Sequence, residues 1–195
     1  MKAVVFASGS GTNFEALMEA QKRGDLDVDI VALFCDKPGV RVFERANRWN
    51  IPSMCIQLKE CENKTDYETR ILRWLEEYDP DLIILSGYMK IVGPTILERY
   101  GGRIVNLHPA LLPRFPGAHA ILDAYEAKVP VTGVTVHYID ENVDTGPVIL
   151  QQEVPVDPAW SLGELESAVH AAEYQTFYKG VNMAAAALAK ELEQE

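Results

Sequence analysis

Cysteine, positive charge and long apolar runs are all scarce in this chain of 195 residues. Its three cysteines, Cys35, Cys55 and Cys61, have no Cys-x-x-Cys spacing, which argues against a disulfide framework or a structural zinc site. No apolar run approaches the roughly 18 residues that a membrane span needs. The opening stretch, residues 1–7, is too short for the apolar part of a secretory signal. We therefore expect a cytoplasmic protein without metal and without a membrane anchor.

Acidic residues outnumber basic ones by 29 to 18, which gives a formal net charge of −11. A protein that grips the backbone of DNA or tRNA needs a broad basic surface, so a nucleic-acid partner is not expected. One small phosphorylated substrate stays compatible with this charge, because backbone N–H groups at a helix start hold a phosphate.

Apolar strand-like runs alternate with amphipathic stretches in the first 108 residues. Strands are expected at residues 2–7, 28–35, 52–57, 81–85 and 103–108, with helices at 14–22, 40–50, after 65 and at 94–100. This alternation predicts βαβ units and an α/β fold with a doubly wound, mostly parallel, Rossmann-like sheet.

The pattern changes after residue 117. A short helix near 119–127 precedes two strand-like runs, 131–139 and 147–154, which predict an antiparallel strand pair. A final long helix follows Ser161 and Glu164, which have capping-box spacing. Thr12 with Glu15, and Thr65 with Glu68, have the same spacing and predict two earlier helix starts.

Gly9 and Gly11 lie between the first strand and the first helix, where a tight turn would expose N–H groups to an anion. The third glycine of the dinucleotide fingerprint is missing, since position 14 is Phe, and there is no Walker A lysine. The spacing favours a single phosphate. A plain turn without ligand and a dinucleotide site with Asp36 on the ribose remain open alternatives.

Asn106 and His108 share one face of the strand that Pro109 ends. Ends of parallel strands are where α/β enzymes place their chemistry. Asp144, fixed by the turn-forming Thr-Gly-Pro that follows it, is the expected carboxylate that keeps His108 protonated, although an ordinary turn role for Asp144 is an open alternative.

Three further histidines are weaker candidates. His119 could line the same cleft, His137 is at least as compatible with a structural role facing Thr135, and His170 is expected at the surface or the rim.

Five motifs together resemble the phosphoribosylglycinamide (GAR) formyltransferases of purine biosynthesis, from the first strand to about Glu173. They are residues 8–13, 87–91, 106–113, 116–117 and 144–147. Asn-x-His-Pro with a distant Asp is shared with the wider folate formyltransferase fold, whereas Ser-Gly-x-Gly-x-Asn is similar to the GAR branch.

The resemblance implies one domain over 1–195, with a phosphate- and GAR-binding half, 1–100, and a catalytic and folate-binding half, 101–195. It implies 10-formyltetrahydrofolate as co-substrate and leaves monomer or homodimer open. The implied catalytic residues are Asn106, His108 and Asp144; those for GAR are Gly11, Thr12, Asn13 and Glu173; those for the folate are Lys64, Met89, Lys90, Ile91, Val92, Asn106, Asp140 and Asp144.

Three positions depart from the family pattern. Lys64 and Lys90 stand where the family often has Arg, which keeps the charge but loses the planar fork. Ala110 stands where Ser is common.

The implied reaction is attack of the GAR amine on the formyl carbon, with the Asn106 amide and a protonated His108 as donors to the developing oxyanion. Alternative readings with the same three residues are a formyltetrahydrofolate hydrolase, methionyl-tRNA formyltransferase and a sugar-nucleotide formyltransferase. Methionyl-tRNA formyltransferase is disfavoured, because it resembles a chain with an added tRNA-binding domain and a basic surface. The hydrolase is disfavoured because it is similar to a chain with an extra N-terminal regulatory domain. A non-catalytic nucleotide-binding domain would instead bind NAD(H) or a mononucleotide and no folate.

Overall fold

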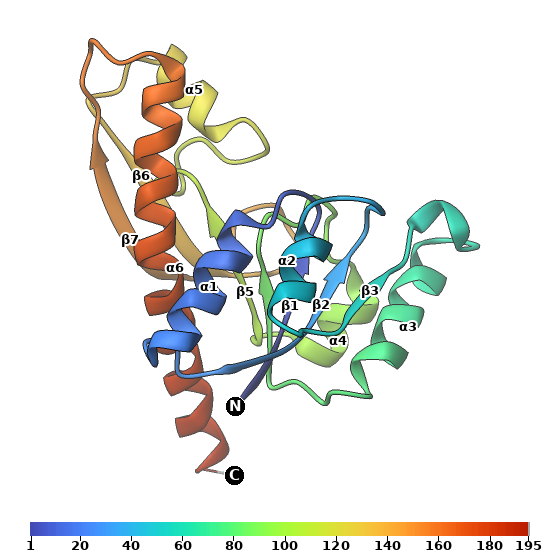
Figure 1. Cartoon of the computed structure of the whole chain (residues 1–195). Coiled ribbons are helices and arrows are strands. Elements are labelled where there is room, and N and C mark those ends of the chain that lie inside the picture. The colour runs from blue at the N-terminus through green and yellow to red at the C-terminus, as the bar shows by residue number, and fades with distance from the viewer. Residues whose placement is uncertain (195) are drawn as a thin grey trace.

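The strands form one seven-stranded sheet in the computed structural model, which describes residues 1–194 (Figure 1). The order across the sheet is β3-β2-β1-β4-β5-β6-β7. The first five strands are parallel, and β6 and β7 add to β5 in antiparallel orientation, which confirms the predicted fold class. The strands are β1 Lys2–Ala7, β2 Asp29–Cys35, β3 Ser53–Cys55, β4 Leu82–Leu85, β5 Ile104–His108, β6 Val131–Tyr138 and β7 Val148–Pro155.

Helices cover both faces of the parallel part of the sheet (Figure 1). One buried cluster lies under α1, α2 and α6, and the other lies under α3 and α4. The antiparallel strands, α5 and the start of α6 extend away from this body. The helices are α1 Thr12–Arg23, α2 Val42–Arg48, α3 Lys64–Leu75, α4 Pro94–Tyr100, α5 Ala120–Glu126 and α6 Leu162–Leu192, with a short 3₁₀ turn at Leu58–Glu60.

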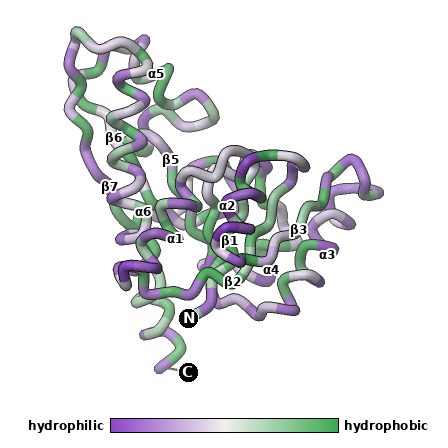
Figure 2. The backbone as a smooth tube through the Cα atoms, viewed as in Figure 1, coloured by the Kyte–Doolittle hydropathy of each residue, from purple (hydrophilic) through white to green (hydrophobic). Residues whose placement is uncertain are grey.

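The central strands are apolar on both faces because both faces are covered. Along β1, Val4 and Phe6 enter the cluster beneath α3 and α4, while Val5 enters the cluster beneath α1 and α6. Figure 2 shows the hydrophobic colour concentrated on these inner strands. In the edge strand β7, only Val154 is buried, and residues 151–153 are polar and exposed. None of the helices within residues 1–194 is both long and apolar enough to cross a membrane.

The predicted starts of α1 and α3 are confirmed to within two residues, but the capping boxes predicted there are wrong. The residue before α1 is Gly11, in a left-handed conformation, and Glu15 instead binds side chains of Arg45, Arg48 and Trp49.

The cap of α3 is the Asn63 side chain, which accepts the N–H of Asp66. Glu68 is buried and accepts the N–H of Gly93, at the start of α4. The capping box of Ser161 and Glu164 is confirmed at the start of α6.

Candidate active site

Two cavities meet at the carboxyl ends of the parallel strands, the edge where α/β folds bind ligands. The loop cavity, about 330 Å³, is lined by residues 8–13, Lys37, Ser86, Gly87 and Met89. The histidine cavity, about 290 Å³, is lined by Leu85, residues 87–92 and 106–109, Gly117, Ala118, Ile139, Asp140 and residues 142–144. Gly87 and Met89 line both cavities, so two ligands bound side by side would share this wall.

The loop cavity is shaped mainly by backbone. Gly11 has φ 75°, and a Cβ there would lie 2.4 Å from Cγ2 of Val42, so only glycine fits this turn. The carbonyls of Gly9 and Ser10 accept from the Val42 N–H and the Arg45 guanidinium, which fixes the loop against α2. The free N–H groups at the start of α1, with Lys37 beside them, form a site suited to an anion. Sequence reasoning missed Lys37, whose only signal is its place after β2.

Asn13 connects the loop cavity to α6. Its amide nitrogen donates to Oε2 of Glu173 at 3.1 Å, and the same oxygen lies 2.8 Å from Nδ1 of His170. Glu173 is buried and lines neither cavity, so it reaches the loop cavity through Asn13. The hydrogen bond to Glu173 raises the pKa of the half-exposed His170. Within the described residues, the buried Oδ1 of Asn13 has no hydrogen-bond partner.

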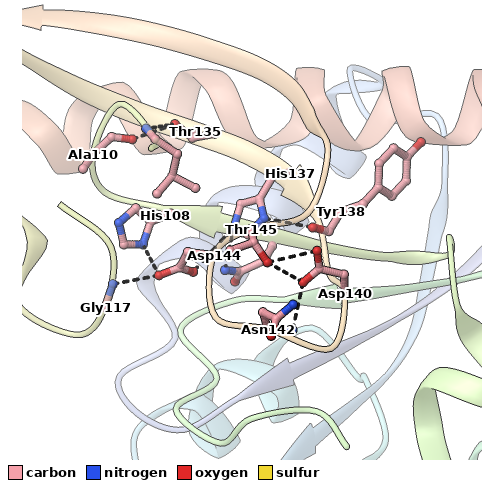
Figure 3. Close-up of polar contacts among 12 residues, drawn as sticks. His108, Ala110, Gly117, Thr135, His137, Tyr138, Asp140, Asn142, Asp144 and Thr145 are labelled. Atoms are coloured by element: carbon pink, nitrogen blue, oxygen red, sulfur yellow. Dashed lines mark hydrogen bonds and ion pairs between the residues drawn. The ribbon is translucent and has the colours of Figure 1, made fainter. Parts of the chain in front are cut away.

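His108 ends β5 as a buried side chain between two acceptors. Its Nδ1 lies 3.5 Å from Oδ2 of Asp144 (Figure 3). Its Nε2 lies 2.7 Å from the carbonyl oxygen of Phe115. A neutral imidazole has one N–H, whereas the imidazolium donates from both nitrogens. An acceptor therefore faces each ring nitrogen of His108.

Asp144 is the junction of the site (Figure 3). Besides facing His108, its Oδ2 accepts the Gly117 N–H at 2.8 Å, and its Oδ1 lies 3.8 Å from Nε2 of His137. Its own φ is 55°, and a Cβ at Gly146 would lie 1.8 Å from the Tyr138 carbonyl oxygen. The turn after Asp144 thus folds back on β6 and fixes the carboxylate.

Asn106 and His137 pair across β5 and β6. Nδ1 of His137 lies 2.9 Å from the Tyr138 carbonyl oxygen, and its Nε2 lies 3.2 Å from the amide nitrogen of Asn106. Burial lowers the pKa of His137, which favours a neutral ring that donates from Nδ1 and accepts the Asn106 amide at Nε2. Sequence reasoning left His137 open between a structural role facing Thr135 and a catalytic one, and the cross-strand pairing with Asn106, which the sequence did not show, is what places it beside the site residues.

Residues 89–92 line the histidine cavity, with the side chains of Met89 and Ile91 63% and 61% exposed. Lys64 lies outside both cavities, where its ammonium group donates to the Ile91 carbonyl and faces Glu68.

Asp140 borders the histidine cavity, and its carboxylate accepts the Asn142 N–H and the Thr145 hydroxyl (Figure 3). These hydrogen bonds lower its pKa. The carboxylate therefore organises the 140–145 loop itself.

The predicted site residues fall into three groups. Gly11, Thr12, Asn13 and Met89 line the loop cavity; Asn106, His108, Asp140, Asp144 and residues 89–92 line the histidine cavity; Lys64 and Glu173 lie behind the cavity walls. Within residues 1–194, no group of three or more His, Cys, Asp or Glu side chains is arranged to hold a metal ion.

The chain matches the formyl transferase family over residues 1–181. It is 44% identical to phosphoribosylglycinamide formyltransferase of Bacillus subtilis over 176 residues, which are 90% of each chain. A solved glycinamide ribonucleotide transformylase 1 from Geobacillus kaustophilus is 49% identical, with TM-score 0.90 over 93% of this chain and 97% of that one.

The solved phosphoribosylglycinamide formyltransferase from Streptococcus pneumoniae is 46% identical, with TM-score 0.86 over 92% of this chain and 96% of that one. The trifunctional purine biosynthetic protein adenosine-3 of Gallus gallus is 37% identical over 95% of this chain, which spans 18% of that relative. These matches confirm the resemblance seen in the sequence motifs. The chain belongs to the formyl transferase family and, within it, to the phosphoribosylglycinamide formyltransferases.

Proposed function

We propose that this enzyme transfers the formyl group of 10-formyltetrahydrofolate to the amine of GAR, in the cytoplasm, as a step of purine biosynthesis. The observation that carries the proposal is the pair of cavities that share Gly87 and Met89, with Asn106, His108 and Asp144 bordering one of them. The chain would work as one domain over 1–195, in which residues 1–100 supply the phosphate loop and 101–195 the catalytic side chains.

GAR would occupy the loop cavity. Its phosphate would accept the N–H groups of Gly11, Thr12 and Asn13, with the ammonium group of Lys37 beside them. Glu173 would act on the glycinamide end through Asn13, whose amide it holds. The loop lacks the third glycine of the dinucleotide fingerprint, which argues against a pyrophosphate. The Asp36 carboxylate already accepts the Ser8 hydroxyl, so binding of a dinucleotide ribose at Asp36 has less support.

The formyl folate would occupy the histidine cavity, with its pterin against residues 89–92 and under the 140–144 loop. The cavity volume of about 290 Å³ is near the lower end of small-molecule sites, as expected for one ring system with its tail outside. The apolar side chains of Met89, Ile91, Val92 and Val143 fit an aromatic ring. Lys90 would face the anionic part of the folate, and Lys64 would support the wall through the Ile91 carbonyl.

The chemistry follows from the donors at this end of β5. The GAR amine forms a bond to the formyl carbon, the bond from that carbon to the folate nitrogen breaks, and the proton lost by the amine ends on that nitrogen. Negative charge develops on the formyl oxygen, toward which Asn106 and cationic His108 would donate. His108 would redirect its Nε2–H hydrogen bond from the Phe115 carbonyl to the formyl oxygen, while the Asp144 carboxylate faces Nδ1. Loss of one such donor typically costs roughly 10²–10³ in rate.

A coupled assay with GAR and 10-formyltetrahydrofolate, following the appearance of deformylated folate, tests the proposal directly. Formation of formylated GAR that depends on both substrates is the expected result. Release of formate with water as the only acceptor would assign the hydrolase reaction instead. No folate turnover, together with a thermal shift on NADH, would overturn the enzyme assignment in favour of a nucleotide-binding domain.

A further inference from the structure

The wall shared by the two cavities is exposed at its centre. Tyr88 packs against Phe6 at one end and Val92 is buried at the other. Between them, Met89 and Ile91 point outward, and residues 87–92 belong to no helix or strand. Side-chain burial therefore does not fix the centre of the wall, and polar contacts from other elements have to do so.

The Ser8 hydroxyl makes one of these contacts and uses both of its hydrogen-bonding functions. Its oxygen accepts the Met89 N–H at 2.9 Å, and its hydrogen goes to Oδ1 of Asp36 at 2.5 Å. Ser8 follows β1 directly and begins the phosphate loop, so the loop and the wall are joined through one hydroxyl.

Asp36 completes the connection from the end of β2. Its side chain is only 2% exposed, and its Oδ2 lies 3.8 Å from Nζ of Lys90. A buried carboxylate is costly unless hydrogen bonds and charge compensate it, and here the compensating groups come from the loop and from the wall. The catalytic steps described above use neither Asp36 nor the Ser8 hydroxyl.

We propose that Ser8 and Asp36 are positioning residues that hold residues 89–91 in place for both substrates before either one binds. This inference rests on the proposed function for the identity of the two ligands. Because Met89 lines both cavities, one anchor prepares both binding sites.

A positioning role has a thermodynamic signature that a direct contact lacks. Without the Ser8 hydroxyl, the wall leaves its binding position part of the time, and the affinity of any ligand that needs the wall falls by the competent fraction. Loss of one hydrogen bond corresponds to about a fivefold change in an equilibrium constant, here the ligand affinity. The first ligand to bind restores the wall, so the second binds almost as it does in the parent protein.

The experiment is calorimetric titration of the parent protein and S8A with GAR and with 5,8-dideazafolate, a folate analogue that carries no formyl group. Each ligand is titrated alone and again with the other at saturation. In S8A, we expect each ligand alone to bind about fivefold more weakly, and each ligand in the presence of the other to bind within twofold of the parent.

Three results would overturn the proposal. They are unchanged affinities in S8A, weakening of one ligand only, and equal weakening of both with and without the partner. The second result assigns Ser8 as a direct contact, and the third as a general structural residue. Failure of the proposed function is separate, because it would appear as absence of turnover by the parent protein.

The control is T132V, which removes a buried hydroxyl that has no hydrogen-bond partner within the described residues and lines neither cavity. All its affinities should stay within twofold of the parent. Should S8A fail to fold, amide hydrogen exchange decides: the Met89 amide must be protected in the parent and exchange faster in D36N. An unprotected Met89 amide in the parent would overturn the proposal.

Discussion

The two cavities are built in opposite ways. The loop cavity is formed by the backbone of a glycine turn packed against α2, and its ligand-facing groups are N–H groups at a helix start. The histidine cavity is lined by Leu85, residues 87–92, the end of β5 and the loops after β5 and β6, and its polar groups meet at the Asp144 carboxylate. The difference teaches that the first cavity should be sensitive to backbone strain, and the second to the charge and orientation of single side chains.

The largest effect is expected from D144N, which tests the histidine cavity. The asparagine oxygen still accepts the Gly117 N–H, so the fold is kept, while the charge facing His108 is lost. Turnover should fall by about 10²–10³, as for loss of an oxyanion donor, with the melting temperature within a few degrees of the parent. Steady-state kinetics and thermal unfolding measure the two quantities, with D140N as the matched loop variant. Turnover of D144N close to the parent value would remove Asp144 from the catalytic group.

The G11A variant tests the loop cavity. Its Cβ would lie 2.4 Å from Val42 Cγ2 at a φ of 75°, so the turn and α2 must shift. We expect a loss of about 1–3 kcal/mol in the free energy of unfolding and a clear rise in KM for GAR, with a smaller change in KM for the folate. Urea unfolding and steady-state kinetics are the measurements.

The matched variant for stability is G9A in the same turn, where a Cβ would meet nothing within 4 Å. Equal destabilisation by G9A and G11A would show that the close approach to Val42 does not shape the loop.

A smaller effect is expected from H137F, which fills similar space but cannot accept the Asn106 amide. The amide would lose its orientation, and kcat should fall about fivefold, the value of one hydrogen bond. KM for GAR should change little, because His137 does not line the loop cavity. An increase in KM for GAR with unchanged kcat would contradict the separation between the two cavities.

The smallest effect concerns His170, whose pKa is raised above 6.5 by its hydrogen bond to Glu173. A raised folded-state pKa stabilises the protein fully below the unfolded value near 6.5, and this stabilisation is lost as the pH rises through the folded-state pKa. The side chain is half-exposed, so we expect less than about 1 kcal/mol. Thermal unfolding of the parent and H170Q should differ most near pH 5.5 and converge above pH 8; a constant difference across this range would contradict the pair.

Local patterns were enough to predict the strands and the fold class. They also predicted the cap of α6, because a capping box within four residues needs no distant partner. The same pattern failed at Thr12, since Glu15 is drawn to the arginines of α2, and at Thr65, since Glu68 is buried against α4. In both cases a tertiary contact used the carboxylate that the local pattern had assigned to a cap.

The candidate site divides along the same line. The glycine turn, the pair Asn106 and His108, and the turn at Asp144 could be read from neighbouring residues. The pairing of Asn106 with His137 depends on the register of an antiparallel strand that begins 25 residues later, and the link from Asn13 to Glu173 spans 160 positions. Neither could be read from spacing alone.

The helix α6 carries a geometric consequence. Glu173 on this helix holds Asn13, and seven residues later Gly180 packs against Val136, where a Cβ would lie 2.5 Å from Cγ1. Val136 immediately precedes His137 in β6. One helix therefore contacts both Asn13, at the start of α1, and the strand that carries His137. With a rise of 1.5 Å per residue, the two contacts are about 10 Å apart along the axis. The distance between these two contacts is therefore set by the rise of the hydrogen-bonded helix, and a one-residue insertion between Glu173 and Gly180 would rotate one contact out of place while leaving the other intact.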